Sequence, residues 1–283
     1  MMAQSMSSRQ SREVVVDGVP IVATDVGAGV PIVLMHGVPD TRHSWSSVVE
    51  HLHATAADRQ RYRIIAPDYP GFGDSPEPPP DFDFRPAANA VLWRGFMDEM
   101  GIDQPAVVCV HDFGGPWLLG WVAAQPERVR GALLLNTLFF RDFRWHVWAR
   151  IWQTRGLGEL SMILANRWLM RREMSALSPG LSRAAIDETY QHFDRSMKRT
   201  ILRCYRMYRD MDEAMGDGEE RLQAALARIP TRVLWGQLDP NLAGPYADRF
   251  SAVPERLEDV GHWVYLERPE RVAEHLRELA DGG

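Results

Sequence analysis

The sequence predicts an α/β fold in which a mostly parallel sheet is flanked by helices. Short apolar runs alternate with segments of helical periodicity, which is typical of βαβ units. The run Ala106–Val110 is apolar throughout, as expected of a strand buried on both faces. Residues 138–218 are rich in Trp, Arg and Met, with helical spacing and no clear strand. We therefore expect a core made of residues 13–137 and 219–283, with a helical cap formed by 138–218.

The individual elements follow from local signals. Asp17-Gly18 separates two short strand-like segments and predicts a hairpin. Residues 1–12 are polar and lack the apolar segment of a signal peptide, so we expect them to be disordered. In chain order we expect strands at 13–16, 20–25, 30–35, 63–67, 106–110, 131–136, 231–235 and 256–259, and helices at about 45–52, 86–100, 116–125 and 269–280.

Composition excludes several function classes. The chain has 283 residues, a net charge of −6 and no long basic run, so neither nucleic acid nor a membrane surface is an expected partner. No apolar stretch is long enough to span a bilayer. The two cysteines, Cys109 and Cys204, lie far apart, which favours a reducing, cytoplasmic location. No His/Cys cluster or phosphate-binding glycine loop appears, so we expect no metal or cofactor, and a monomer or homodimer.

The segment after Val110 is the main candidate for chemistry. His111-Asp112-Phe113-Gly114-Gly115 joins a strand to a helix, and small residues at such a sharp bend are typical of a nucleophile elbow. Asp112 occupies the tip of the bend. Asp239 and the turn His36–Pro39 also follow expected strand ends, so we expect all three to meet at one edge of the sheet. The alternative is that Asp112 only caps the helix, in an inactive protein.

Five motifs in this order resemble α/β-hydrolases of the epoxide hydrolase and haloalkane dehalogenase branch, over residues 13–280. The resemblance implies an α/β-hydrolase fold whose helical cap is inserted after the sixth core strand. The motifs are His36-Gly37-Val38-Pro39, Asp68-Tyr69-Pro70-Gly71-Phe72-Gly73-Asp74-Ser75, His111-Asp112-Phe113-Gly114-Gly115, Trp235-Gly236-Gln237-Leu238-Asp239 and Gly261-His262.

The resemblance also implies an Asp-His-Asp triad. Asp112 would be the nucleophile, His262 the base and Asp239 its partner, in the chain order of this fold. A carboxylate can form an ester at saturated carbon, and an imidazole can then activate the water that hydrolyses the ester. The backbone N–H groups of Phe113 and Val38 would form the oxyanion hole.

The leaving group is not fixed by Asp112. The segment Leu202–Arg206 is similar to the family's cap segment that carries a proton-donating tyrosine, here Tyr205. In the family a second tyrosine assists the first, and by spacing its position is occupied here by Trp148. The indole N–H of Trp148 is also able to hold a halide. Of the motif-turn residues, His36, Gly37 and Pro39 keep the family pattern.

Two departures weigh against a dehalogenase, because Phe113 stands where a halide-binding Trp is expected and Val38 where a polar residue is common. One departure weighs against an epoxide hydrolase, because Val110 stands where those enzymes usually have Gly. We favour an epoxide hydrolase that gives vicinal diols, with a haloalkane dehalogenase as the alternative and a non-catalytic ligand-binding protein as a third possibility. The substrate should be small to medium and apolar, since aromatic residues crowd the start of the cap, namely Phe139, Phe140, Trp145, Trp148 and Trp152.

Overall fold

The structure is a computed structural model, which describes residues 11–282. Within this range the strands form one sheet of eight, in the order β1-β2-β4-β3-β5-β6-β7-β8. β2 is antiparallel to both its neighbours, and the other neighbouring strands are parallel. The predicted mostly parallel α/β fold is thus confirmed. The strands are β1 (Ser11–Val16), β2 (Val19–Gly27), β3 (Val30–Met35), β4 (Tyr62–Pro67), β5 (Ala106–Asp112), β6 (Val129–Thr137), β7 (Thr231–Gly236) and β8 (Pro254–Leu257).

The first hairpin starts earlier than the sequence predicts. Asp17-Gly18 forms the expected turn, with φ of 48° and 80°. Ser11 and Arg12, which we expected to be disordered, belong to β1 and pair with β2. The guanidinium of Arg12 also donates to the backbone carbonyls of Glu99 and Met100, which ties the start of the strand to the core. The rest of the expected disordered segment, residues 1–10, lies outside the described residues.

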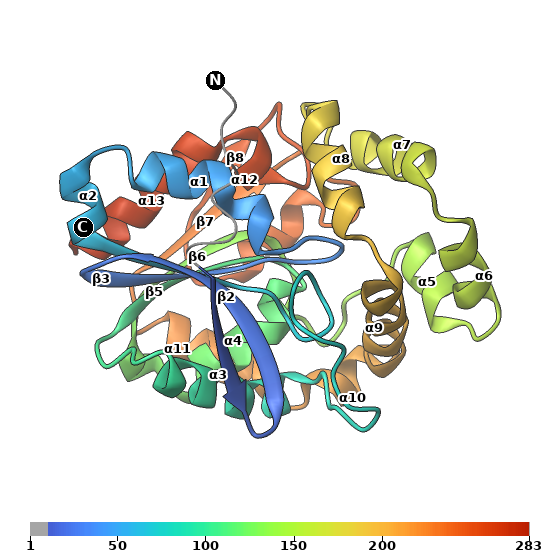
Figure 1. Ribbon diagram of the computed structural model, residues 1–283, viewed down its shortest axis with the longest axis horizontal. Coiled ribbons are helices and arrows are strands. Elements are labelled where there is room, and N and C mark those ends of the chain that lie inside the picture. The colour runs from blue at the N-terminus through green and yellow to red at the C-terminus, as the bar shows by residue number, and fades with distance from the viewer. Residues whose placement is uncertain (1–10, 283) are drawn as a thin grey trace.

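Helices cover both faces of the sheet (Figure 1). α1, α12 and α13 pack on one face, and α3, α4 and α11 pack on the other. β5 runs between these layers, so its side chains are buried on both sides: Val108 and Val110 face one layer, and Val107 and Cys109 face the other. The helices outside the cap are α1 (Ser46–Leu52), α2 (Ala56–Arg61), α3 (Pro86–Glu99), α4 (Gly114–Ala124), α11 (Gly218–Leu226), α12 (Val264–Glu267) and α13 (Pro269–Asp281).

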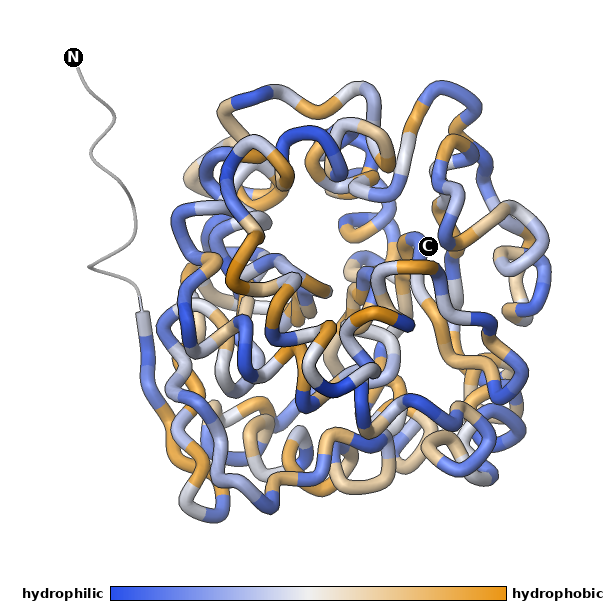
Figure 2. The backbone as a smooth tube through the Cα atoms, turned by 90° about the vertical axis from the view of Figure 1, so that its right-hand side faces the viewer, coloured by the Kyte–Doolittle hydropathy of each residue, from blue (hydrophilic) through white to orange (hydrophobic). Residues whose placement is uncertain are grey.

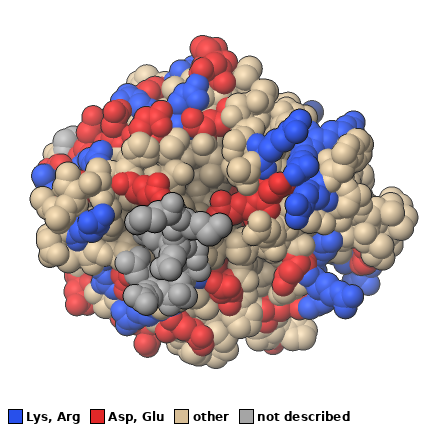
Figure 3. Space-filling model, turned by 45° about the horizontal axis from the view of Figure 1, so that its top comes forward, with Lys and Arg blue, Asp and Glu red and all other residues tan. Residues whose placement is uncertain are grey.

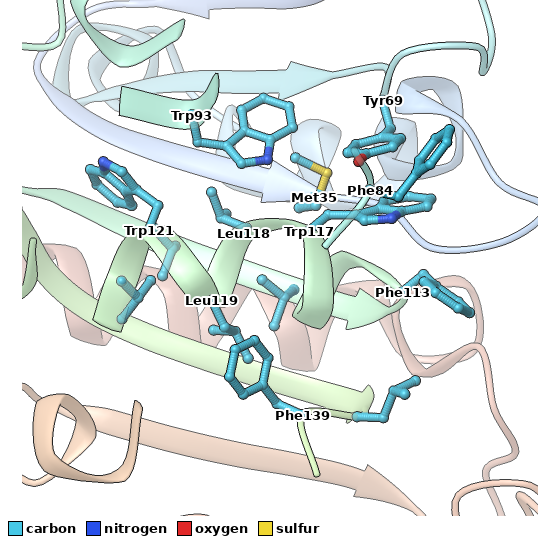
Figure 4. Close-up of a cluster of buried hydrophobic side chains, with 14 of the residues drawn as sticks. Met35, Tyr69, Phe84, Trp93, Phe113, Trp117, Leu118, Leu119, Trp121 and Phe139 are labelled. Atoms are coloured by element: carbon cyan, nitrogen blue, oxygen red, sulfur yellow. The ribbon is translucent and has the colours of Figure 1, made fainter. Parts of the chain in front are cut away.

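The layer that contains α4 is rich in large aromatic side chains (Figure 4). The Tyr69 ring stacks on the Trp117 indole, with centroids 3.8 Å apart and an interplanar angle of 7°. Phe113, at the start of α4, extends this cluster toward the cap and packs 4.8 Å from the ring of Tyr205. The helix that follows Asp112 is therefore anchored in a closely packed region, which favours a rigid bend.

Between β6 and β7 the described chain is helical and contains no strand. Of the helices in this segment, α5–α10 lie beside one end of the sheet, at the right of Figure 1, whereas α11 belongs to the layer with α3 and α4. Figure 2 views the molecule from this side and shows hydrophobic and hydrophilic positions alternating along the nearer helices. We refer to α5–α10 as the cap: α5 (Val147–Gln153), α6 (Leu157–Leu164), α7 (Arg167–Leu177), α8 (Arg183–His192), α9 (Arg195–Met207) and α10 (Met211–Met215).

Candidate active site

The bend between β5 and α4 is sharp, as the sequence predicts. Asp112 has φ of +50°, a left-handed conformation that non-glycine residues rarely adopt. Neighbouring glycines leave room for it, since a Cβ on Gly37 would lie 2.4 Å from the Cβ of Asp112. A Cβ on Gly115 would lie 2.2 Å from Thr137 Oγ1, the hydroxyl that donates to the Asp112 carbonyl at 2.6 Å. The backbone thus fixes where the carboxylate points.

The Asp112 carboxylate lines a pocket and is held by backbone donors. Its Oδ1 accepts a hydrogen bond from the Val38 N–H at 2.9 Å, and the Phe113 N–H also donates to the carboxylate. Burial raises the pKa of Asp112, while the charge of His262 and these two N–H groups oppose the rise. The two N–H groups expected to form an oxyanion hole therefore converge on this carboxylate.

His262 lies between two carboxylates. Its Nδ1 donates to Asp239 Oδ2 at 2.6 Å, and its Nε2 lies 3.6 Å from Asp112 Oδ2. Burial disfavours the imidazolium, but Asp239 and Asp112 outweigh this effect and raise the pKa of His262 to about 9. Burial also acts against the Asp239 carboxylate, yet His262 and several hydrogen bonds lower its pKa to about 2. The structure thus brings together the three side chains that the sequence selects.

Asn136 supports Asp239. It lies near the end of β6, and its Nδ2 donates to Asp239 Oδ2 at 2.9 Å. The same amide exchanges hydrogen bonds with the backbone of Gly236, at 2.8 and 3.1 Å. The other oxygen of Asp239 accepts from the N–H groups of Asn241 and Leu242. With all these donors present, the carboxylate is held in place and stays ionised.

The turn that carries Val38 is fixed by its own histidine. His36 Nδ1 donates to the Gly37 carbonyl at 2.8 Å, and His36 Nε2 accepts from the Tyr69 N–H at 3.0 Å. Burial lowers the pKa of His36 to about 4, so the ring is neutral at pH 7. The peptide bond between Val38 and Pro39 is cis, and both residues line the pocket. His36 is therefore a structural residue, while Val38 and Pro39 border the site.

The pocket lies between the strand ends and the cap and has a volume of about 140 Å³. Its wall is mainly apolar, as expected for an apolar substrate. The lining includes Val38, Pro39, Asp112, Leu138, Phe143, Trp145, His146, Trp148, Trp152, Ser161, Met162, Ala165, Asn166, Leu169, Met170, Glu173, Met174, Leu177, Phe193, Ile201, Tyr205, Asn241, Leu242, His262 and Trp263.

The two expected leaving-group residues differ in availability. Tyr205 is buried against Phe113, and its hydroxyl has no hydrogen-bond partner among residues 11–282. Trp148 lines the pocket too, but its indole N–H donates to Glu173 Oε2 at 2.8 Å. Tyr208, one turn after Tyr205, donates to the Phe84 carbonyl at 2.6 Å. In this conformation Tyr205 alone among these three side chains has an uncommitted donor.

His146 is a site residue that the sequence reasoning missed. It lines the pocket at the start of α5, with its ring centroid 6.3 Å from that of Tyr205. Its Nδ1 accepts the Ala149 N–H at 3.3 Å, and burial lowers its pKa to about 4. The ring is therefore neutral at pH 7 with its proton on Nε2. The sequence did contain a signal for this residue: His146 stands two residues before Trp148, the position at which the second proton donor was expected.

Fold and site together define an α/β-hydrolase, and a family comparison agrees: the model of the alpha/beta hydrolase family matches residues 32–275, so the chain belongs to this family. Haloalkane dehalogenase 2 of Mycobacterium tuberculosis is 26% identical over 262 residues, which cover 88% of this chain and 87% of that protein. Bifunctional epoxide hydrolase 2 of Mus musculus is 31% identical over 122 residues, 43% of this chain and 21% of that protein.

Among solved structures, the ligand-free epoxide hydrolase CorEH has the same fold, with a TM-score of 0.76 and 19% identity over 95% of this chain and 98% of that chain. The relatives support a hydrolase of the epoxide hydrolase and haloalkane dehalogenase branch. Within residues 11–282 no helix is long and apolar enough to cross a membrane. Nor does that range contain a group of His, Cys, Asp or Glu side chains placed to hold a metal ion.

Proposed function

We propose that this hydrolase opens epoxides to vicinal diols through an ester formed on Asp112. The observation that carries the proposal is the uncommitted hydroxyl of Tyr205 in the pocket, because an opening epoxide needs a proton donor. A halide needs N–H donors instead. Three of the four tryptophans that line the pocket already donate their indole N–H to protein acceptors, namely Trp145, Trp148 and Trp263.

In the first step Asp112 Oδ2 attacks one epoxide carbon, since Oδ1 is held by the Val38 N–H. The C–O bond of the ring breaks, its electron pair goes to the epoxide oxygen, and that oxygen takes the proton of Tyr205. The His146 Nε2–H is a suitable second donor to the same oxygen. Burial raises the pKa of Tyr205 well above its usual value, so the phenolate that forms readily takes back a proton.

In the second step water attacks the ester carbonyl carbon and gives its proton to His262 Nε2. The ester has removed the charge of Asp112, one of the carboxylates that raise the pKa of His262, so the imidazole is more often neutral at this stage. Negative charge on the carbonyl oxygen is stabilised by the N–H groups of Val38 and Phe113. The acyl C–O bond then breaks, the diol leaves with the proton from His262, and Asp112 remains as the carboxylic acid. Its proton is then lost, which restores the carboxylate and balances the proton that the Tyr205 phenolate takes up.

Trapping the ester tests this mechanism. In His262→Gln, incubation with styrene oxide should raise the protein mass by the mass of the epoxide, and peptide mapping should place the addition on Asp112. Asp112→Asn is the control and should acquire no addition. Absence of any adduct in His262→Gln, with the fold intact by circular dichroism, would contradict the mechanism. That outcome would favour a non-catalytic ligand-binding protein.

A haloalkane dehalogenase is the second candidate, favoured by the relative of that name that matches 88% of this chain. The same Asp112 attack would then release halide, with Trp152 as the pocket indole that has no protein acceptor among the described residues. Incubation of His262→Gln with 1-bromohexane distinguishes the two. Alkylation and bromide release at a rate similar to or above that of epoxide opening would favour the dehalogenase.

A further inference from the structure

We infer that the part of the pocket around Glu173 is a subsite for a positively charged group at the far end of an elongated apolar substrate. The inference deepens the proposed function, since it names the substrate class for the same pocket. It rests on the path of the pocket wall, on the environment of the Glu173 carboxylate and on the charges that line the cavity.

A series of aromatic rings leads from Asp112 to Glu173. Phe113, next to Asp112, packs against Tyr205 with centroids 4.8 Å apart, and Tyr205 packs against Trp152 at the same separation. Trp152 in turn stacks on Trp148 at 6.4 Å, and the Trp148 indole donates to Glu173. Glu173 therefore lies beyond two indoles from the proton donor, away from the reacting carbon.

The Glu173 carboxylate remains able to bind a ligand. Only its Oε2 is engaged by Trp148, and its side chain is 32% exposed. Its cationic neighbour, Arg172, lies 3.5 Å from Oε1 with a side chain that is 65% exposed. Exposed ion pairs of this kind are weak, so a ligand cation can compete for Oε1.

The lining of the pocket favours cations over anions. Among its lining residues in the described chain, no Lys or Arg appears, while Asp112 and Glu173 supply two carboxylates. His146 is neutral at pH 7, and His262 is already paired with Asp239. The outer surface differs, because Lys and Arg gather at the right of Figure 3, on the cap side. Indole faces and a carboxylate together suit an ammonium group, whereas the cationic side chain in the lining, His262, already lies between the carboxylates of Asp239 and Asp112 and is not free for a substrate carboxylate.

Binding of three probes of equal chain length tests the subsite without requiring turnover. We would titrate the full chain with octylamine, 1-octanol and octanoate at pH 7 and follow tryptophan fluorescence. Octylammonium should bind about five- to tenfold more tightly than octanol, and octanoate more weakly than octanol. In Glu173→Gln, which keeps the shape and an acceptor for Trp148, the advantage of octylammonium should fall below twofold while octanol binding stays unchanged.

Glu188→Gln is the matched control, because Glu188 is an exposed cap residue outside the pocket lining and should leave all three affinities unchanged. An unchanged order of affinities in Glu173→Gln, or octanoate binding as tightly as octylammonium to the parent protein, would overturn the subsite. So would the absence of binding by all three probes. If the expected affinities appear but epoxides and bromoalkanes give no adduct in His262→Gln, the proposed reaction fails and the subsite stands.

Discussion

The carboxyl ends of the strands, which we call the sheet edge below, and the cap hold their pocket side chains in different ways. At the sheet edge the backbone decides, since Asp112 and Asn136 have positive φ and the glycines around Asp112 leave no room for a Cβ. In the cap, side chains hold one another: Trp148 is oriented by Glu173, and Tyr205 by aromatic neighbours. The difference separates the groups of the triad, which the backbone at the strand ends positions, from the proton donor and the substrate contacts of the cap, which side-chain packing positions.

The largest effect should come from the edge. Asp112→Asn replaces the attacking carboxylate by a neutral amide of the same shape, so turnover should fall by about 10⁴-fold or more. Steady-state assays with styrene oxide measure the loss. Because burial raises the pKa of this carboxyl, the variant should melt at the same temperature as the parent or higher. A variant that retains a tenth of the activity would refute the assigned role.

The next largest effect should come from a cap substitution, Tyr205→Phe. Removal of the proton donor should lower kcat for epoxides by about 10²- to 10⁴-fold, because general acid catalysis contributes on that scale. Displacement of bromide from 1-bromohexane, if it occurs, should change by less than about threefold, since halide needs no proton. Tyr190→Phe, in α8 and outside the pocket lining, serves as the control. Equal losses on both substrates would show that Tyr205 only supports packing.

A smaller effect concerns pH. Hydrolysis of the ester requires neutral His262, so its rate should rise with pH up to the pKa of that imidazole and level off above it. This pKa should lie below the value of about 9 in the free enzyme, because the ester removes the charge of Asp112. Below it the rate should fall about tenfold per pH unit. Rapid-mixing measurement of ester decay gives the profile, and a pH-independent rate from pH 5 to 9 would exclude His262 as the base.

The smallest effect should come from Trp148→Phe. The indole N–H is engaged with Glu173, so loss of this donor should change kcat for epoxides by less than about threefold and stability by about 1 kcal/mol. Steady-state assays and thermal melts measure both quantities. A loss of tenfold or more in kcat would restore Trp148 to the leaving-group role that sequence spacing suggests.

The same division explains what the sequence was able to predict. Strand ends are marked by short motifs with glycine and proline, so the positions of Asp112, Asp239 and His262 followed from local pattern and resemblance. The strand that the apolar pattern predicts at 131–136 also places Asn136 at a strand end. Its hydrogen bond to Asp239 depends on the pairing of β6 with β7, which no local pattern specifies.

Other features depend on contacts between distant segments. The hydrogen bond from Trp148 to Glu173 joins α5 to α7. His146 enters the pocket because α5 begins directly after it, and residue spacing alone did not predict that start. At the N-terminus, Arg12 is ordered through carbonyls at the end of α3. β8 begins at Pro254, two residues before the expected strand, because its register follows from pairing with β7.

Asn136 and Asp239 reach the same point from neighbouring strands, one as an amide and the other as an acid. An exchange of these two side chains would conserve composition, net charge and the number of donors around the imidazole. A side chain on β6 thus lies one hydrogen bond away from the partner of His262, so the two neighbouring strands together fix the position of that partner.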